Sequence, residues 1–234
     1  MELKNLNEMT VEEIKEQICE IGHRVWQQGW VAANDGNITV KLGENRFLAT
    51  PTGISKSFLT PEMIIEIDGE GKIIDGNTKY RPSSELPMHL RCYRDRDDVR
   101  AVVHAHPPTA TGFAIANIPL DKYTMPEAII SLGSVPIAKY GTPSTQEVPD
   151  AVAEYLPDHD VMLLQNHGAI SVGADLITAY YRMECLELFA KTSLVARQLG
   201  GEKELSREQI EGCLELRRKF KFTGRHPGYK KYSK

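Results

Sequence analysis

Patterns typical of strands and of helices alternate along the whole chain, and this alternation constrains the fold more than any other feature. Helical patterns, with apolar residues every three or four positions, cover residues 10–29, 174–198 and 206–220. Shorter apolar strand patterns lie between the helical ones, and no Pro/Ser-rich linker, internal repeat or low-complexity segment divides the chain. Elements interleaved in this way pack as helices that cover a central sheet. We therefore predict that residues 1–234 form a single α/β domain, an α/β/α sandwich.

The strand patterns also indicate how the sheet is built. In the first half, the strand patterns at 38–40 and 46–49 are close enough to pair as a hairpin, which makes neighbouring strands antiparallel. In the second half, further strand patterns at 99–105 and 161–164 are almost purely apolar, as expected for buried strands. The sequence thus predicts a mixed, largely antiparallel sheet, and residues 220–234 are predicted to form a mobile tail.

The charge balance and the cysteines exclude several classes of protein. The chain has 28 Lys and Arg against 32 Asp and Glu, which argues against a nucleic-acid binder. No apolar run approaches the roughly 18 residues of a membrane helix, and the N-terminus lacks the pattern of a secretory signal. The four cysteines are scattered and form no CxxC pair, which favours reduced thiols. We therefore expect a cytoplasmic protein that binds neither nucleic acid nor membranes.

Three histidines stand at the ends of predicted buried strands. His104 and His106 lie two residues apart at the end of the strand 99–105, so their side chains project to the same side. An isolated pair of this kind is weak evidence, but His167 follows a second buried strand, 161–164. Three neutral imidazoles leave the full charge of a zinc ion in place and one coordination position open, as catalytic zinc sites require. The three side chains could therefore converge on one metal ion at a sheet edge.

Three further segments have the character of anion-binding turns. Ser83 and Ser84 precede a predicted helix, where hydroxyls and free amides suit a phosphate. The glycine-containing turns 35–37 and 50–53 let the backbone approach a ligand closely, although each turn alone is weak evidence. Glu85 is either a first-turn carboxylate that complements the helix dipole or a general base. No GxGxxG or P-loop pattern is present, which disfavours a nucleotide site.

Taken in order, these motifs resemble those of the class II aldolase/adducin head family over about residues 8–200, most strongly those of its members that act on L-fuculose 1-phosphate. The resemblance implies an α/β/α fold, one Zn²⁺ per subunit and a cyclic homotetramer with active sites between subunits. It implies that the zinc ligands are His104, His106 and His167. It implies that the substrate phosphate is bound by Gly36, Asn37, Thr52, Gly53, Ser83 and Ser84.

The same resemblance implies two catalytic residues. Glu85 matches the catalytic carboxylate of the family, and Tyr123 matches a tyrosine that the neighbouring subunit contributes as proton donor and acceptor. The chain departs from the family near its C-terminus, where a second tyrosine is expected and Thr223 is the best-aligned residue. Tyr229 and Tyr232 are the nearby tyrosines, and the sequence does not indicate which of them, if either, completes the site.

The resemblance implies a lyase of carbohydrate metabolism, in fucose catabolism. This would be a zinc-dependent aldolase that reversibly cleaves a ketose 1-phosphate, L-fuculose 1-phosphate above all, to dihydroxyacetone phosphate and a short aldehyde such as L-lactaldehyde. The sequence leaves open which aldehyde or sugar phosphate is preferred, the geometry of the oligomer and the pathway.

Four alternatives are weaker. L-ribulose-5-phosphate 4-epimerase has Asp at the position of Glu85, and a dehydratase of the same superfamily would lack the Ser-Ser-Glu pattern. A non-catalytic interaction module like the adducin head would lack the metal ligands. A lysine-dependent aldolase needs a desolvated lysine in a pocket, whereas the predicted inner strands end in histidine.

Overall fold

The computed structural model describes residues 6–75 and 79–232. Its seven-stranded sheet, counted over these residues, has the order β3-β2-β1-β4-β7-β6-β5. The strands are β1 (Asn37–Gly43), β2 (Arg46–Ala49), β3 (Ile65–Ile67), β4 (Ala101–Ala105), β5 (Ile137–Ala138), β6 (Val161–Leu164) and β7 (Gly168–Gly173). Neighbouring strands are antiparallel except β5 and β6, which are parallel. The predicted mixed, largely antiparallel sheet is confirmed.

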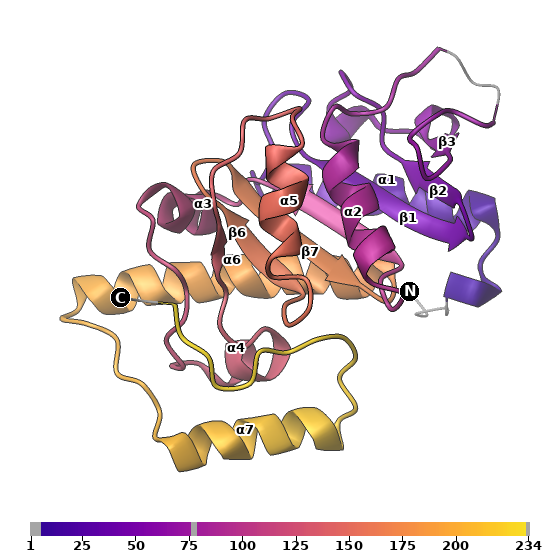
Figure 1. Cartoon of the computed structure of the whole chain (residues 1–234). Coiled ribbons are helices and arrows are strands. Elements are labelled where there is room, and N and C mark those ends of the chain that lie inside the picture. The colour runs from indigo at the N-terminus through magenta and orange to yellow at the C-terminus, as the bar shows by residue number, and fades with distance from the viewer. Residues whose placement is uncertain (1–5, 76–78, 233–234) are drawn as a thin grey trace.

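The helices are α1 (Val11–Gln27), α2 (Leu86–Asp95), α3 (Pro108–Ile115), α4 (Pro126–Ser131), α5 (Glu147–Ala153), α6 (Leu176–Gln198) and α7 (Arg207–Lys219). Helices cover both faces of the sheet, whereas α7 lies away from the sheet and packs against α4 (Figure 1). Because side chains alternate along a strand, Val103 packs with α1, α3 and α6, whereas its neighbour Val102 packs with α2 and α5. This arrangement confirms the predicted α/β/α sandwich. No helix of the described segments is long and apolar enough to span a membrane.

Two predicted helix starts are confirmed in atomic detail. Thr10 caps α1: its hydroxyl accepts a hydrogen bond from the backbone N–H of Glu13 at 3.2 Å, and the Glu13 carboxylate accepts one from the backbone N–H of Thr10 at 2.7 Å. Ser206 and Gln209 make the same reciprocal pair at the start of α7. Such boxes satisfy backbone donors that a helix start leaves free, so they set the residue at which each helix begins.

Some elements of the structure are short. Residue 73 makes only an isolated bridge, between Ile67 and Ile73. The strand β5 has two residues and lies next to Pro136, which lacks the N–H that a ladder needs. Pro61–Met63 forms a 3-10 turn, in which the Thr60 side chain makes no capping bond.

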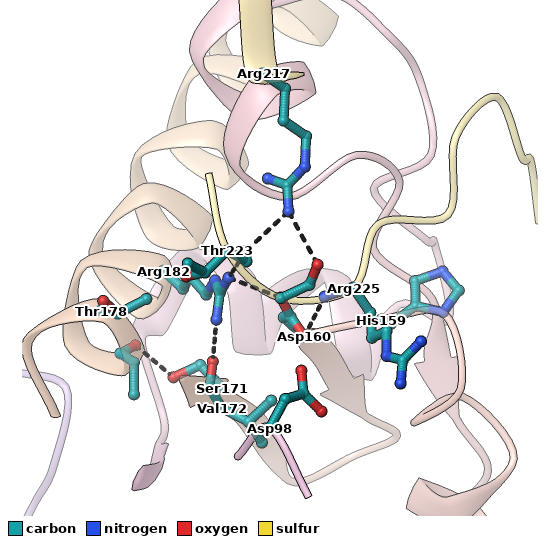
Figure 2. A network of polar contacts seen from close by, with 12 residues as sticks. Asp98, His159, Asp160, Ser171, Val172, Thr178, Arg182, Arg217, Thr223 and Arg225 are labelled. Atoms are coloured by element: carbon teal, nitrogen blue, oxygen red, sulfur yellow. Dashed lines mark hydrogen bonds and ion pairs between the residues drawn. The ribbon is translucent and has the colours of Figure 1, made fainter. Parts of the chain in front are cut away.

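Residues 220–232 lie against the body of the domain, and a buried charge cluster fixes them there (Figure 2). Arg182 and Arg217 both donate to the carbonyl of Thr223, at 2.7 and 2.9 Å. The carboxylate of Asp160 accepts from the backbone N–H of Arg225 at 3.1 Å and pairs with Arg182 at 2.7 Å. The two arginines thus bind this segment through the backbone carbonyl of Thr223. Whether the segment is mobile stays a prediction.

The buried His89 on α2 makes one prediction about stability. Its Nδ1 lies 2.9 Å from the Thr39 hydroxyl of β1. Burial lowers the pKa of His89 from 6.5 to about 4, although the Glu85 carboxylate opposes that shift. The folded protein therefore keeps this imidazole neutral where the unfolded chain protonates it. This contribution to stability is fully present above pH 6.5 and is lost as the pH falls toward 4, by about 3 kcal/mol in all.

We expect the free energy of unfolding of His89→Gln to depend less on pH than that of the unaltered protein between pH 7 and 4.5. Urea unfolding at both pH values and at one protein concentration measures the difference. His23→Gln, on the partly exposed part of α1, is the control that should keep the full pH dependence. An equal pH dependence in His89→Gln and the unaltered protein would contradict the assignment.

Candidate metal and phosphate site

The topology of the sheet brings the three predicted histidines to one edge. His104 is in β4, His106 follows the end of β4, and His167 lies in the turn between β6 and β7. Because β7 pairs antiparallel with β4, with Ala105 opposite Ala169, the end of β4 lies beside the turn that carries His167. His167 therefore lies beside His104 and His106, which are 63 and 61 positions earlier in the chain, as the positions of the strand ends predict.

The three imidazoles face a common point. The Nε2 atoms of His104 and His106 are 3.2 Å apart, and one ring nitrogen of each histidine lies within 4.8 Å of the other two. The Nδ1 of His104 lies 2.9 Å from the carbonyl oxygen of Ala169, which accepts a hydrogen bond from the Nδ1–H group. In this tautomer Nε2 carries no proton, and its lone pair faces the cluster. Two nitrogens bound to one tetrahedral zinc ion are about 3.3 Å apart, given Zn–N distances of about 2.0–2.1 Å. These residues fit a zinc ion with one coordination position left over.

The electrostatics of the cluster also suit a metal. Burial is the main cause that lowers the pKa of His104, to about 3, and it lowers the pKa of His106 as well. Both rings are therefore neutral at pH 7, which is the form that binds a metal ion. These two imidazoles can bind a cation without first losing protons.

Glu85, immediately before α2, reaches the same cluster. Its carboxylate oxygens lie 3.0 Å from Nε2 of His167 and 3.5 Å from Nε2 of His104, and Asn37 donates to it at 2.7 Å. Burial opposes the ionisation of Glu85, but its electrostatic interaction with the His104 ring and the hydrogen bonds from His167 and Asn37 outweigh burial and hold the pKa of Glu85 below the usual range. Glu85 is thus an ionised carboxylate beside the metal cluster.

A cleft of about 190 Å³ opens in front of the histidines. Its walls are formed by Asn34, Asp35, Gly36, Asn37, Pro51, Thr52, Ser83, Ser84, Glu85, His106, Pro143 and His167. The three turns predicted to bind an anion therefore meet beside the cluster. Of the six predicted phosphate ligands, five line the cleft, and Gly53 continues the turn of Thr52 with a φ of +76°.

Gly36 occupies a position that only glycine fits. Its φ is +71°, and an added Cβ would lie 2.6 Å from Val31 Cγ1 and 2.9 Å from the carbonyl of His104. A side chain here would be strained and would push the turn away from β4. Its absence lets the 35–37 turn pack directly on the strand that carries His104.

Tyr123 is not in this cleft. Only 1% of it is exposed, and it packs with Ile129 of α4 and Ile210 of α7, away from the sheet edge. Its hydroxyl lies 2.7 Å from the carbonyl of Gly228 and accepts from the backbone N–H of Lys230 at 2.7 Å. The structure therefore brings Glu85 and the three histidines together within one chain, but it does not bring Tyr123 to them.

The two C-terminal tyrosines occupy different places. The ring of Tyr229 stacks on Tyr123 with ring centres 5.0 Å apart. The hydroxyl of Tyr232 lies instead 2.9 Å from Nε2 of His159. Thr223, the residue that aligns best with the family's second tyrosine, uses its carbonyl to bind Arg182 and Arg217. Tyr229 is thus the C-terminal tyrosine that accompanies Tyr123.

Three residues near the site were not predicted from the sequence. Asp35 has a carboxylate oxygen 3.7 Å from Nδ1 of His106, and Pro143 lines the cleft from the loop after β5. Lys56 is buried behind the cleft wall, where its ammonium donates to backbone carbonyls. A lysine between two serines normally indicates an exposed turn, so the sequence contained no signal for this burial.

Gly168 allows a test of the histidine geometry. An added Cβ would lie 2.5 Å from Cδ2 of His106 and 2.7 Å from the carbonyl of Ala105, so Gly168→Ala should displace the ring or the end of β4. We expect metal affinity to fall by about tenfold or more. Calorimetric zinc titration measures this, with Gly212→Ala as control because nothing lies within 4 Å of its added Cβ. Normal zinc affinity in Gly168→Ala would show that His106 is not held as described.

Comparison with known proteins identifies the family of this chain. The family described as Class II Aldolase and Adducin N-terminal domain matches residues 16–194. An L-fuculose phosphate aldolase of Methanocaldococcus jannaschii is 34% identical over 77% of this chain and 96% of its own length. A 3-oxo-tetronate 4-phosphate decarboxylase of Escherichia coli is 30% identical over 76% of this chain and 84% of its own length.

A solved structure of L-fuculose 1-phosphate aldolase extends the likeness to three dimensions. It superposes with a TM-score of 0.79 at 30% identity, covering 90% of this chain and 97% of that one. The match includes the layered architecture on which the cleft depends. The chain therefore belongs to the class II aldolase/adducin family and has the fold of its aldolases.

Proposed function

We propose that this chain is a zinc-dependent aldolase that reversibly cleaves a ketose 1-phosphate to dihydroxyacetone phosphate and a short aldehyde. L-fuculose 1-phosphate and L-lactaldehyde are the first pair to test, because relatives bearing the L-fuculose phosphate aldolase name include a 34% identical protein. The observation that carries the proposal is that metal ligands, a carboxylate and anion-binding turns all meet at one cleft. His106, His167, an ionised carboxylate and three donor-rich turns line the same 190 Å³ space, and His104 lies beside them, with its Nε2 3.2 Å from that of His106.

Each part of the cleft has a role in this proposal. The metal ligands are His104, His106 and His167, and a bound zinc ion would supply Lewis-acid stabilisation of the charge that develops on substrate oxygen. The phosphate ligands are Gly36, Asn37, Thr52, Gly53, Ser83 and Ser84, whose hydroxyls, amide and backbone N–H groups suit an anion. Phosphate binding at one end of the cleft would place the substrate's carbonyl end beside the histidines.

Glu85 would move the proton at carbon. In condensation, the ionised Glu85 carboxylate would remove a proton from the carbon of dihydroxyacetone phosphate that becomes C3. Cleavage is the reverse: the bond between C3 and C4 breaks, and the Glu85 carboxyl, after taking up a proton from solvent, would protonate C3 of the three-carbon fragment to give dihydroxyacetone phosphate and would become ionised again. The hydrogen bond from Asn37 at 2.7 Å fixes the direction in which the carboxylate points.

Tyr123 would act from a second subunit. Because it lies outside the cleft of its own chain, a role at the C4 hydroxyl requires a neighbouring copy, as in the proposed cyclic homotetramer with sites between subunits. Tyr229, stacked on Tyr123, would be presented with it. The segment 228–230, which binds the Tyr123 hydroxyl, would have to release it before proton transfer.

A second candidate is decarboxylation of a phosphorylated 3-oxo acid. The observation in its favour is the E. coli relative named 3-oxo-tetronate 4-phosphate decarboxylase, 30% identical to this chain. Loss of carbon dioxide from such an acid also leaves an electron-rich fragment, so a similar cleft serves both reactions. Glu85 disfavours the 4-epimerase, which has Asp there, and the histidine cluster disfavours a non-catalytic module.

The test offers dihydroxyacetone phosphate to the purified protein with a panel of short aldehydes, including L-lactaldehyde and glycolaldehyde, with and without a chelator. We expect a ketose 1-phosphate to form and the chelator to abolish its formation. Release of carbon dioxide from 3-oxo-tetronate 4-phosphate, without condensation of any aldehyde, would assign the second candidate instead. Condensation that persists after complete removal of metal would contradict the proposed mechanism.

A further inference from the structure

Lys56 carries a positive charge in the interior of the protein, directly behind the cleft wall. It lies in the 3-10 turn Lys56–Phe58 and is only 2% exposed. Its ammonium donates to the carbonyls of Asn34 at 3.2 Å and Ile54 at 3.3 Å, and it forms no ion pair with a carboxylate of the described segments. A buried charge with no carboxylate in direct contact is costly, so its presence calls for an explanation.

The two carbonyls that Lys56 binds belong to the segments that form the phosphate turns. Asn34 lines the cleft just before the turn 35–37, and Ile54 directly follows the turn of Thr52 and Gly53. The charge of Lys56 also interacts with the carboxylates of Asp35 and Glu85, which both line the cleft. Although burial lowers the pKa of Lys56 to about 8, the ammonium remains mostly protonated at pH 7.

The cleft itself lacks a cation for an anionic ligand. Its lining contains two carboxylates, Asp35 and Glu85, but no lysine or arginine. Apart from a metal ion held by the histidines, a phosphate dianion entering between the turns would meet this negative charge and neutral donors. Lys56 lies one layer behind those donors, where low polarity strengthens its field.

We propose that Lys56 gives the cleft its preference for phosphorylated ligands: its buried charge stabilises the phosphate through the wall, and its two hydrogen bonds position the phosphate turns relative to each other. Lys56 is a positioning residue in this scheme and not a nucleophile, because its ammonium does not line the cleft. This inference rests on the proposed function insofar as that function places the phosphate in this cleft.

The experiment compares Lys56→Met with the unaltered, zinc-loaded protein by calorimetric titration with dihydroxyacetone phosphate and with dihydroxyacetone. We expect Lys56→Met to bind the phosphorylated compound about 10- to 100-fold more weakly and the unphosphorylated one unchanged. Because methionine removes an uncompensated buried charge at similar length, the ligand-free melting temperature should not fall. Lys72→Met, whose side chain is 73% exposed, is the matched control and should bind both compounds normally.

Several outcomes would overturn the inference. Unchanged affinity for dihydroxyacetone phosphate in Lys56→Met would do so, and so would an equal loss for both compounds, which indicates a purely structural role. If Lys56→Met does not fold, the comparison is made between Lys56→Gln and Lys56→Arg, of which only the charge-conserving variant should keep the preference.

Failure of the proposed function is recognised separately. If the unaltered protein binds inorganic phosphate but not dihydroxyacetone phosphate, the proposed substrate is wrong. The Lys56 inference is then tested with inorganic phosphate, for which weaker binding by Lys56→Met supports it and equal binding overturns it. If the unaltered protein binds neither, both proposals are contradicted.

Discussion

Replacing Glu85 with glutamine is expected to lower aldolase turnover by about 10²–10⁴-fold while the protein still folds and binds metal. Glutamine keeps the size of the side chain, and its carbonyl oxygen can still accept the 2.7 Å hydrogen bond from Asn37. It cannot take up or deliver a proton at pH 7. The loss should therefore fall on proton transfer rather than on assembly of the cleft.

Proton exchange isolates this step from cleavage. In heavy water, the unaltered protein should exchange one carbon-bound proton of dihydroxyacetone phosphate without any aldehyde, and Glu85→Gln should not, as followed by proton NMR. Glu70→Gln is the control, since the Glu70 side chain is 73% exposed and pairs with Lys72 on the surface. Exchange and turnover at the unaltered rate in Glu85→Gln would refute the role assigned to Glu85.

The second large effect concerns the metal ligands. His167→Ala removes one of the three imidazoles, and we expect it to lose most of its zinc and to lower turnover by about 10³-fold or more, because several kcal/mol of charge stabilisation disappear. His167 suits this test because 17% of its side chain is exposed and it lies in a turn, whereas the His104 side chain is fully buried in β4. Truncating His167 should therefore leave the core intact.

Zinc content after dialysis, measured by mass spectrometry, and turnover in the same samples check this prediction. The unaltered protein should lose activity with a chelator and regain it when zinc is added, whereas His167→Ala should not regain it. His23→Ala, a histidine on α1 outside the cluster, should behave like the unaltered protein. Stoichiometric zinc together with full activity in His167→Ala would remove His167 from the metal site.

The central part of the site could be predicted because it depends on strand ends. The apolar runs before His104 and His167 indicate buried strands, and the ends of buried strands expose polar side chains at a sheet edge. The antiparallel pairing of β4 with β7 then brings the two runs together. The helix caps at Thr10 and Ser206 could be predicted for a similar reason, because a capping box involves residues only three positions apart.

Features that depend on contacts between distant segments could not be predicted. The burial of Lys56 follows from the packing of its 3-10 turn against α1 and the carbonyl of Asn34, 22 residues away. The buried position of Tyr123 depends on hydrogen bonds from its hydroxyl to a segment more than 100 residues later in the chain. Arg182 and Arg217 bind the backbone carbonyl of Thr223. Because every residue has such a carbonyl, the sequence does not indicate which one an arginine will bind. The short α4 has no side-chain cap bond, and its local signal is limited to Pro126 at its first position.

The account as a whole depends on one metal ion held between His104, His106 and His167. Anomalous X-ray diffraction from crystals of the zinc-loaded protein, recorded on both sides of the zinc absorption edge, tests this directly. We predict one anomalous peak per chain, about 2.0–2.1 Å from a nitrogen of each of the three imidazoles. A peak located elsewhere, or three imidazoles that point apart with no peak between them, would contradict the account.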